Sequence, residues 1–354
     1  MFKTNCSKSV KNYYVSEFTA QYKAQNENAN PDIEMMFNGL SEHSIALQYY
    51  YISVNENPLG SKDALMSAKD NSGYSELHEE VHPVIRDYLK KFGYYDIFLV
   101  DIETGDIVYS VYKELDYTTS LLDGPYANTN FGEAFRKAGN GSGKDTWIIT
   151  DFAKYLPSYN APAGFIASPI FHKGKKIGVA IFQFPIDKLN EIMMERAGMG
   201  KTGETYLVGP DKLMRSNSYL DPKNHSVIAS FMNPQTGSVD TVAVKEASEG
   251  NTDTGIIIDY NGNPFLSAYT PLEIGDFSWA LLAEIDKAEA FSAINSIEWL
   301  MAIIAVIGIV AIVIVAFLIT RSITKPIQKG VEFAEALSKG DLTSRVDITR
   351  DAVN

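Results

Sequence analysis

The hydrophobic pattern of the chain is dominated by one uninterrupted apolar stretch near the C-terminus, Trp299–Thr320, which contains no charged residue. At about 1.5 Å of rise per residue, a helix over this stretch is long enough to span the hydrocarbon core of a bilayer. Acidic residues precede the stretch and basic residues follow it, beginning with Arg321. The positive-inside rule therefore places residues 1–298 outside the cytoplasm and residues 321–354 inside it.

Before this stretch, the chain divides into a helical part and a strand-rich part. In residues 1–55 apolar side chains recur every four positions, as between Val10 and Tyr22, which predicts helices with a break at Asn30-Pro31. A second helical pattern ends at Gly93. From there on, short β-branched and aromatic runs alternate with turn sequences such as Glu103–Asp106, which predicts antiparallel strands.

The strand pattern occurs twice. Pro264–Leu272 is similar to Gly164–Phe171, and Ser278–Asp286 is similar to Gly178–Asp187. A repeat of this kind predicts an α+β chain with two tandem antiparallel modules behind a long N-terminal helix. The predicted parts are a helical region 1–80, a first module 81–197, a second module 198–286, a short helix 287–298, the span 299–320 and a cytoplasmic segment 321–354.

The segment after the span has an apolar stripe at helical spacing. The stripe consists of Ile323, Ile327, Val331, Ala334 and Leu337. Pro326 falls in the first turns of the predicted helix, and Gly340 ends it. Such a stripe needs partner helices, and a second copy of the chain supplies them most simply, so the sequence predicts a homodimer. Leu342, Val346 and Ile348 follow as a spaced connector.

Composition and charge exclude some classes of function. The formal net charge is −13, and an acidic chain is not expected to bind nucleic acid. The single cysteine, Cys6, excludes an internal disulfide. Residues 1–18 contain no apolar export signal, although a large domain outside the membrane needs one. We therefore expect that an N-terminal span has been lost or that the start is misplaced.

The order of these parts resembles a bacterial methyl-accepting chemotaxis receptor. Residues 1–290 are similar to a double-Cache sensor with two PAS-like modules, and the Lys325-Pro326-Ile327 and Gly340-Asp341-Leu342 triplets resemble the first helix and connector of a HAMP domain. The resemblance implies a receptor in the inner (cell) membrane, with a periplasmic or extracellular sensor and a cytoplasmic C-terminus. It also implies signalling to cytoplasmic chemotaxis proteins through an output domain beyond residue 354. The alternative is the same sensor input of a histidine kinase or nucleotide cyclase.

The resemblance also implies a small-ligand site in the first module, between its sheet and the loops over it. Aromatic faces and a carboxylate suit a ligand with an ammonium group. The amino-acid-sensing subclass has an arginine followed by Trp-Tyr, whereas Ile148 follows Trp147 here, so the sequence leaves the ligand open. The predicted ligand-binding residues are Tyr109, Tyr117, Tyr126, Trp147, Asp151, Tyr155, Tyr159 and Gln183. The alternative is that most of the tyrosines pack in the core or at its rim.

Two motifs imitate catalytic sites. His78–His82 matches HExxH, but Pro83 follows directly, disfavours a continuous helix, and leaves no evident third ligand. Gly198–Thr202 imitates a phosphate-binding loop, but Glu195 stands where that loop requires glycine. An extracellular metalloprotease is therefore the weaker alternative. We predict no enzyme activity, no metal site and no cofactor.

In the second module, Arg215 and Tyr269 are candidates for lining a smaller cavity. We expect this module to serve more as a relay toward the membrane than as a ligand site. No Ser/His/Asp or Cys/His arrangement fit for nucleophilic catalysis is recognisable in the sequence.

Overall fold

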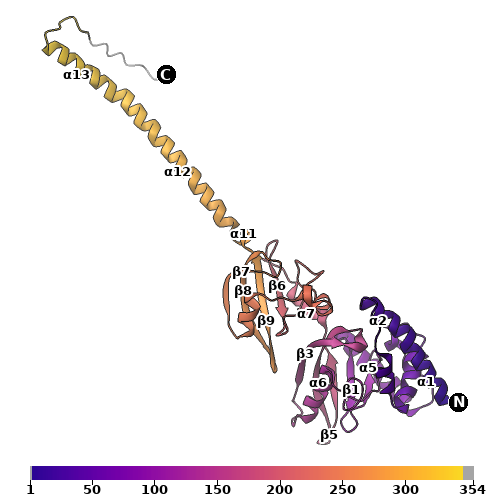
Figure 1. Cartoon of the computed structure of the whole chain (residues 1–354). Coiled ribbons are helices and arrows are strands. Elements are labelled where there is room, and N and C mark those ends of the chain that lie inside the picture. Colours follow the sequence, from indigo (N-terminus) through magenta and orange to yellow (C-terminus); the bar gives the residue numbers. More distant parts are fainter. Residues whose placement is uncertain (1, 346–354) are drawn as a thin grey trace. The chain divides into compact units, whose positions relative to one another are not determined.

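A computed structural model describes residues 2–345 of the chain. It divides into two units, Met1–Lys287 and Ala288–Asn354, each described here by itself. Within the first unit, helices are followed by two antiparallel sheets (Figure 1). This arrangement confirms the predicted α+β fold class with two sheet modules.

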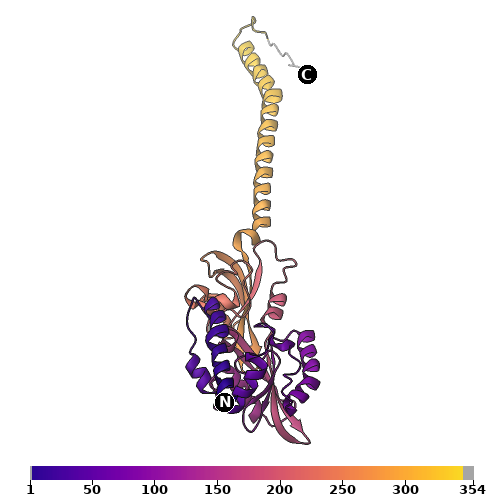
Figure 2. The ribbon, with the colours of Figure 1, turned by 90° about the vertical axis from the view of Figure 1, so that its right-hand side faces the viewer.

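The N-terminal helices form a layer of their own beside the first sheet. Figures 1 and 2 show these indigo helices against the magenta strands. Their buried side chains, including Tyr14, Phe18 and Tyr51, pack with Leu115 and Tyr117 of the first module. The elements are α1 (Phe2–Tyr13), η1 (Tyr14–Phe18), α2 (Thr19–Gln25), α3 (Ile33–Asn38), α4 (Glu42–Gln48), η2 (Tyr49–Ser53), η3 (Lys62–Ala64) and α5 (Gly73–Phe92).

The first sheet has five strands in the order β2-β1-β5-β4-β3, and its neighbouring strands are antiparallel. Its two faces bury different side chains, because successive residues of a strand point to opposite sides. Phe98 and Val100 pack under α6, whereas Ile97 packs with Leu89 of α5. The elements are β1 (Ile97–Asp101), β2 (Ile107–Ser110), α6 (Asn130–Asn140), β3 (Ile148–Tyr155), η4 (Leu156–Ser158), β4 (Ala161–His172) and β5 (Lys175–Gln183).

The second sheet repeats the first in the order β6-β9-β8-β7. Its strands correspond to β1, β5, β4 and β3, and α10 covers it as α6 covers the first sheet. The counterpart of β2 is reduced to a single bridge between Val208 and Met214. The elements are α7 (Ile186–Met193), β6 (Glu204–Val208), α8 (Val227–Met232), α9 (Pro234–Gly237), α10 (Val242–Ser248), β7 (Asp253–Ile258), β8 (Pro264–Ile274) and β9 (Phe277–Asp286).

The second unit is almost entirely helical. It contains α12 (Ser292–Ile319), η5 (Thr320–Thr324) and α13 (Lys325–Ser338), and this run includes a helix long and apolar enough to cross a membrane. The predicted helix 287–298 is corrected: α11 (Lys287–Ala290) is short and a break at Phe291 separates it from α12. Gly340, with φ +86°, follows the end of α13 as predicted. The connector positions 346 and 348 lie outside the described residues.

Candidate ligand-binding site

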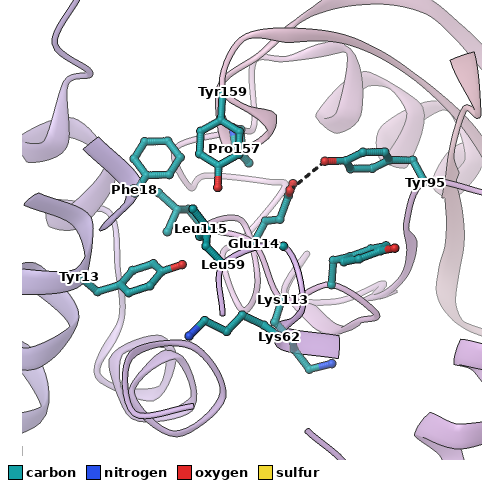
Figure 3. A pocket seen from close by; sticks show the side chains of 12 residues that line it. Tyr13, Phe18, Leu59, Lys62, Tyr95, Lys113, Glu114, Leu115, Pro157 and Tyr159 are labelled. Carbon is teal, nitrogen blue, oxygen red and sulfur yellow. Dashed lines mark hydrogen bonds between the residues drawn. The ribbon is translucent and has the colours of Figure 1, made fainter. Parts of the chain in front are cut away.

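A cavity of about 240 Å³ lies between the N-terminal helices and the loops beside the first sheet (Figure 3). We call it the Glu114 cavity. Five separate segments enclose it: the N-terminal helices, the turn that leads into η3, the loop between α5 and β1, the segment after β2 and the loop around η4. Its lining residues are Tyr13, Phe18, Leu59, Gly60, Lys62, Tyr95, Tyr112, Lys113, Glu114, Leu115, Pro157 and Tyr159.

Tyr159 is held in place from two sides. Its backbone has φ +58°, a left-handed conformation, and its carbonyl accepts a hydrogen bond of 2.9 Å from Asn26 Nδ2. Its ring stacks on Phe18 with centroids 5.2 Å apart. The N-terminal helices therefore fix one wall of the cavity, so the first sheet alone does not complete the site.

Glu114 brings a carboxylate to the cavity. Tyr95 Oη donates to its Oε1 at 3.1 Å (Figure 3), and Ser158 Oγ donates to its Oε2 at 3.1 Å. Burial, together with the neighbouring carboxylates of Asp116 and Asp96, raises the pKa of Glu114 well above its ordinary value. A carboxylate in this setting gains from a cation beside it, because a nearby positive charge favours the ionised form.

Lys62 brings the opposite charge. Its Nζ donates to the Asn55 carbonyl at 2.7 Å and lies 5.5 Å from the centroid of the Tyr13 ring. Burial lowers the pKa of Lys62. An ammonium has three donors, so the one bond to Asn55 leaves two for a ligand.

The Lys113 ammonium is occupied within the protein. It lies 4.7 Å from the centroid of the Tyr109 ring and 5.5 Å from that of Tyr117, and it donates to the carbonyls of Ser110 and Val111. Burial lowers the pKa of Lys113 to about 7. Tyr109 and Tyr117, both predicted as ligand contacts, therefore surround a lysine of the chain.

Of the eight predicted ligand-binding residues, Tyr159 alone is in the lining of the Glu114 cavity. Tyr155 is fully buried and donates to Asp116, and its ring lies beside that of Tyr126 in the core under the first sheet. Trp147 is 60% exposed, and Gln183 lines a different cavity. The interpretation of these tyrosines as core residues therefore fits Tyr126 and Tyr155.

Asp151 lies at the junction of the two modules and is not in the lining of the Glu114 cavity. Arg215 Nε and Nη2 donate to its two carboxylate oxygens at 2.7 and 2.8 Å, and Trp279 Nε1 donates to Oδ1 at 2.9 Å. Arg215, predicted to line a second cavity, is instead buried in this ion pair. Tyr269 packs in the core of the second sheet.

The HExxH histidines are packing residues. α5 continues through Pro83, and the rings of His78 and His82 stack with centroids 4.4 Å apart. His82 bonds Tyr109 Oη at 2.7 Å and the Asp63 carbonyl at 2.8 Å. Burial lowers the pKa of His78 to about 3 and that of His82 to about 4. Among residues 2–345, no group of three or more His, Cys, Asp or Glu is arranged to hold a metal ion.

The sequence reasoning missed the charged residues of the site. Lys62 comes two residues after Gly60, and Glu114 follows Lys113 in the segment after β2. A Lys-Glu pair at the end of a strand was the available signal, because charged side chains in the loops over a sheet are well placed for binding.

Comparison with known proteins assigns the family. Residues 7–294 match the Cache domain family dCache_1, and the chain therefore belongs to this family of double-Cache sensors. This confirms the resemblance to the sensor of a chemotaxis receptor. The probable chemoreceptor y4sI of Sinorhizobium fredii is 25% identical over 92% of this chain and 40% of its own length. The methyl-accepting chemotaxis protein McpB of Bacillus subtilis is 28% identical over 48% of this chain and 23% of its own length.

Two of the solved structures that match the chain are chemoreceptor domains. The periplasmic sensory domain of Campylobacter jejuni Tlp1 is 16% identical, with a TM-score of 0.42, over 78% of this chain and 94% of that one. The ligand-binding domain of Pseudomonas aeruginosa PctB in complex with L-Gln is 17% identical, with a TM-score of 0.40, over 82% and 98%. The chain spans less than half the length of the curated relatives it matches.

Proposed function

We propose that this chain is the extracytoplasmic sensor of a transmembrane chemoreceptor and that its Glu114 cavity binds one small zwitterionic molecule. The observation that carries the proposal is the pair of opposite charges, Lys62 and Glu114, in the lining of one small, aromatic-walled cavity. Few polar groups in a mostly apolar cavity are the usual composition of a small-molecule site.

Each end of such a ligand has a partner. An ammonium group fits beside Glu114, where the rings of Tyr95 and Tyr159 add attraction for a cation. An acid group fits beside Lys62, whose Nζ has donors to spare. The charge pattern is that of a small amino acid, a class that the sequence motifs alone did not favour.

Ligand binding acts by favouring one conformation of the sensor. We place the transmission path along β9, through α11 and α12, to α13, which we interpret as the first helix of a HAMP domain. The functional form in this proposal is a homodimer in the inner membrane, in contact with lipid, with its C-terminus in the cytoplasm and an output that reaches chemotaxis signalling proteins. A histidine kinase or nucleotide cyclase output is the alternative, and the sequence after residue 354 distinguishes them.

A thermal-shift screen of the full chain in lipid nanodiscs tests the ligand class. The probes are the L-amino acids, short dicarboxylic acids and n-alkylamines. We expect a zwitterion to raise the melting temperature of the wild type and to lose this effect in both Glu114→Gln and Lys62→Met. The control is Glu103→Gln, which changes an exposed carboxylate paired with Lys175. A zwitterion shift that survives in both cavity variants, or a response to amines and acids alone, contradicts the proposal.

A further inference from the structure

Helix α5 has an exposed apolar side in addition to its buried side. The buried side carries His78, His82 and Leu89. Beside it, five apolar residues recur at intervals of four, three, four and four positions, which places them along one side of the helix. They are Leu77, Val81, Val84, Tyr88 and Phe92, and we call them the α5 ridge. A surface helix typically has one apolar stripe, which faces the core, so the α5 ridge needs an explanation of its own.

The α5 ridge is open to solvent over most of its length. The exposed fraction is 43% at Tyr88 and 71% at Val84, with Leu77 and Phe92 between these values. The rings of Tyr88 and Phe92 pack together with centroids 4.4 Å apart, so one end of the ridge is aromatic. A row of large apolar side chains at the surface marks an interaction site, and aromatic residues are enriched in such contacts.

Two charged residues beside the α5 ridge select the partner. Glu80 stands three positions after Leu77 and Lys91 three positions after Tyr88, so both exposed side chains flank the ridge on the same side. In an antiparallel pair of identical helices, equivalent flanks meet, and Glu80 of one copy comes beside Lys91 of the other. In a parallel pair, Glu80 instead meets the opposite flank, where Ile85 stands. Flanking charges set the partner and the orientation of paired helices, and these charges suit a second, antiparallel copy.

We propose that the α5 ridge is an interface between two copies of this chain, packed antiparallel about a two-fold axis beside Val84. In this register, Leu77 lies against Phe92 of the second copy. Val81 lies against Tyr88 of the second copy, and each contact occurs twice, as in any two-fold interface. The same register leaves the flanking charges of opposite sign about 3 Å apart along the helix axis. This interface lies in the first module, whereas the contact between subunits proposed from the sequence lies on α13.

Disulfide crosslinking of the full chain in membranes tests the interface and its direction. In a Cys6→Ala background, Val84→Cys is expected to crosslink to itself, because the two-fold axis passes beside it. The matched control is Ile192→Cys on α7, since both native residues are 71% exposed, and it should crosslink severalfold more slowly. Leu77→Cys should not crosslink to itself, because the two thiols lie about 22 Å apart in the antiparallel pair. It should crosslink to Phe92→Cys when the two chains are co-expressed.

Charge reversal separates recognition from folding. Glu80→Lys and Lys91→Glu, both at exposed positions, should each slow the crosslinking of Val84→Cys severalfold, with an unchanged melting temperature. The double reversal should restore the rate, which a misfolded chain does not do.

Several outcomes overturn the interface. They are a reactive Val84→Cys thiol that never crosslinks to a second copy, a Leu77→Cys chain that crosslinks to itself as fast as Val84→Cys, and single charge reversals without effect. Crosslinks between α13 helices with none at residue 84 also overturn it. That last result leaves the α13 contact standing, so the two proposals fail separately.

Discussion

Arg215 and Asp151 join the two modules through a two-point ion pair, with Nε and Nη2 of the arginine on the two carboxylate oxygens. The arginine side chain is 1% exposed, so its charge has little access to water. Removing one partner of a buried pair costs about 3 kcal/mol or more when the other is left uncompensated. Arg215 Nη2 also pairs with Asp211 Oδ1 at 2.9 Å, so the arginine keeps one carboxylate when Asp151 is removed. We therefore expect Asp151→Ala to lower the free energy of unfolding by part of that amount, and not to act on ligand affinity directly.

Urea unfolding of the full chain measures this effect. The control is Glu103→Ala, which breaks the exposed pair with Lys175 and is expected to cost about 0.5 kcal/mol or less. A double variant, Asp151→Ala with Arg215→Met, is expected to recover part of the loss, because it also removes the buried guanidinium that keeps only Asp211 as a partner. An Asp151→Ala chain as stable as the wild type refutes this account of the junction.

Ligand binding in the Glu114 cavity is expected to release a proton. The raised pKa of Glu114 favours its neutral form in the empty site, and an ammonium group beside it favours the carboxylate. Affinity for a zwitterion therefore increases as the pH rises toward that raised pKa. At higher pH the affinity decreases again. The pKa of Lys62 is lowered, so its ammonium loses its proton at a lower pH than an exposed lysine does. Calorimetry in two buffers of different ionisation enthalpy measures the number of protons released on binding. Glu114→Gln should abolish this release.

His82 is expected to weaken the fold at acid pH. The unfolded chain binds a proton at this histidine near pH 6.5, whereas the folded chain resists protonation until its pKa of about 4. Stability from this group is therefore full above pH 6.5 and is lost as the pH falls toward 4, by roughly 2–3 kcal/mol. His82→Gln should reduce this loss of unfolding free energy at acid pH, measured by urea unfolding over a pH series. His43→Gln, at an exposed position on α4, should not change it. Chelators should leave the unfolding transition of the wild type unchanged.

Ile307→Arg is expected to prevent stable membrane insertion of α12. A charge at the centre of a spanning helix costs about 2.5–3.5 kcal/mol on insertion scales. The measurement is the fraction of chain retained in alkali-washed membranes. Ile256→Arg, at an exposed isoleucine of the second module, serves as the control and should be retained like the wild type. Complete retention of the Ile307→Arg chain argues against the span.

The stripe on α13 is expected to meet the same stripe of a second subunit. Ile327 and Val331 are 61% exposed in the single chain, which leaves an apolar helix face without cover. Cysteines at these positions, in a Cys6→Ala background, should crosslink between subunits in membranes. Lys329→Cys, between the two along the chain but on another face of the helix, should crosslink weakly. Reactive thiols at residue 327 that never crosslink refute the dimer.

The sequence predicted the elements that have a clear period. Strands β4, β5, β8 and β9 consist of long β-branched and aromatic runs, and their repetition predicted two modules. β7 was missed because Asp253–Ile258 is a short edge strand with glycine in its middle. Pro83 did not interrupt α5, because it lies on the exposed face, where water can satisfy the Glu79 carbonyl left without its N–H partner.

The ligand site was less accessible to sequence reasoning. Tyr13, Lys62, Glu114 and Tyr159 come from four separated segments, and periodicity does not say which loops meet. Asp151 looked like a ligand contact because it stands among aromatic residues, but its partner Arg215 lies 64 positions further along the chain. A carboxylate's availability depends on that partner, which only the tertiary structure reveals.

Strand β9 connects the junction of the two modules to α11 without an intervening loop. Trp279 donates to Asp151 near the start of the strand, and Asp286 at its end is joined directly to Lys287 of α11. Both edges of β9 are hydrogen-bonded, to β6 and to β8, so the strand cannot lengthen or buckle without breaking ladder bonds. We therefore expect a displacement of Trp279 along the strand to reach Lys287 with little loss, so that β9 acts as a rigid rod in the transmission path proposed above.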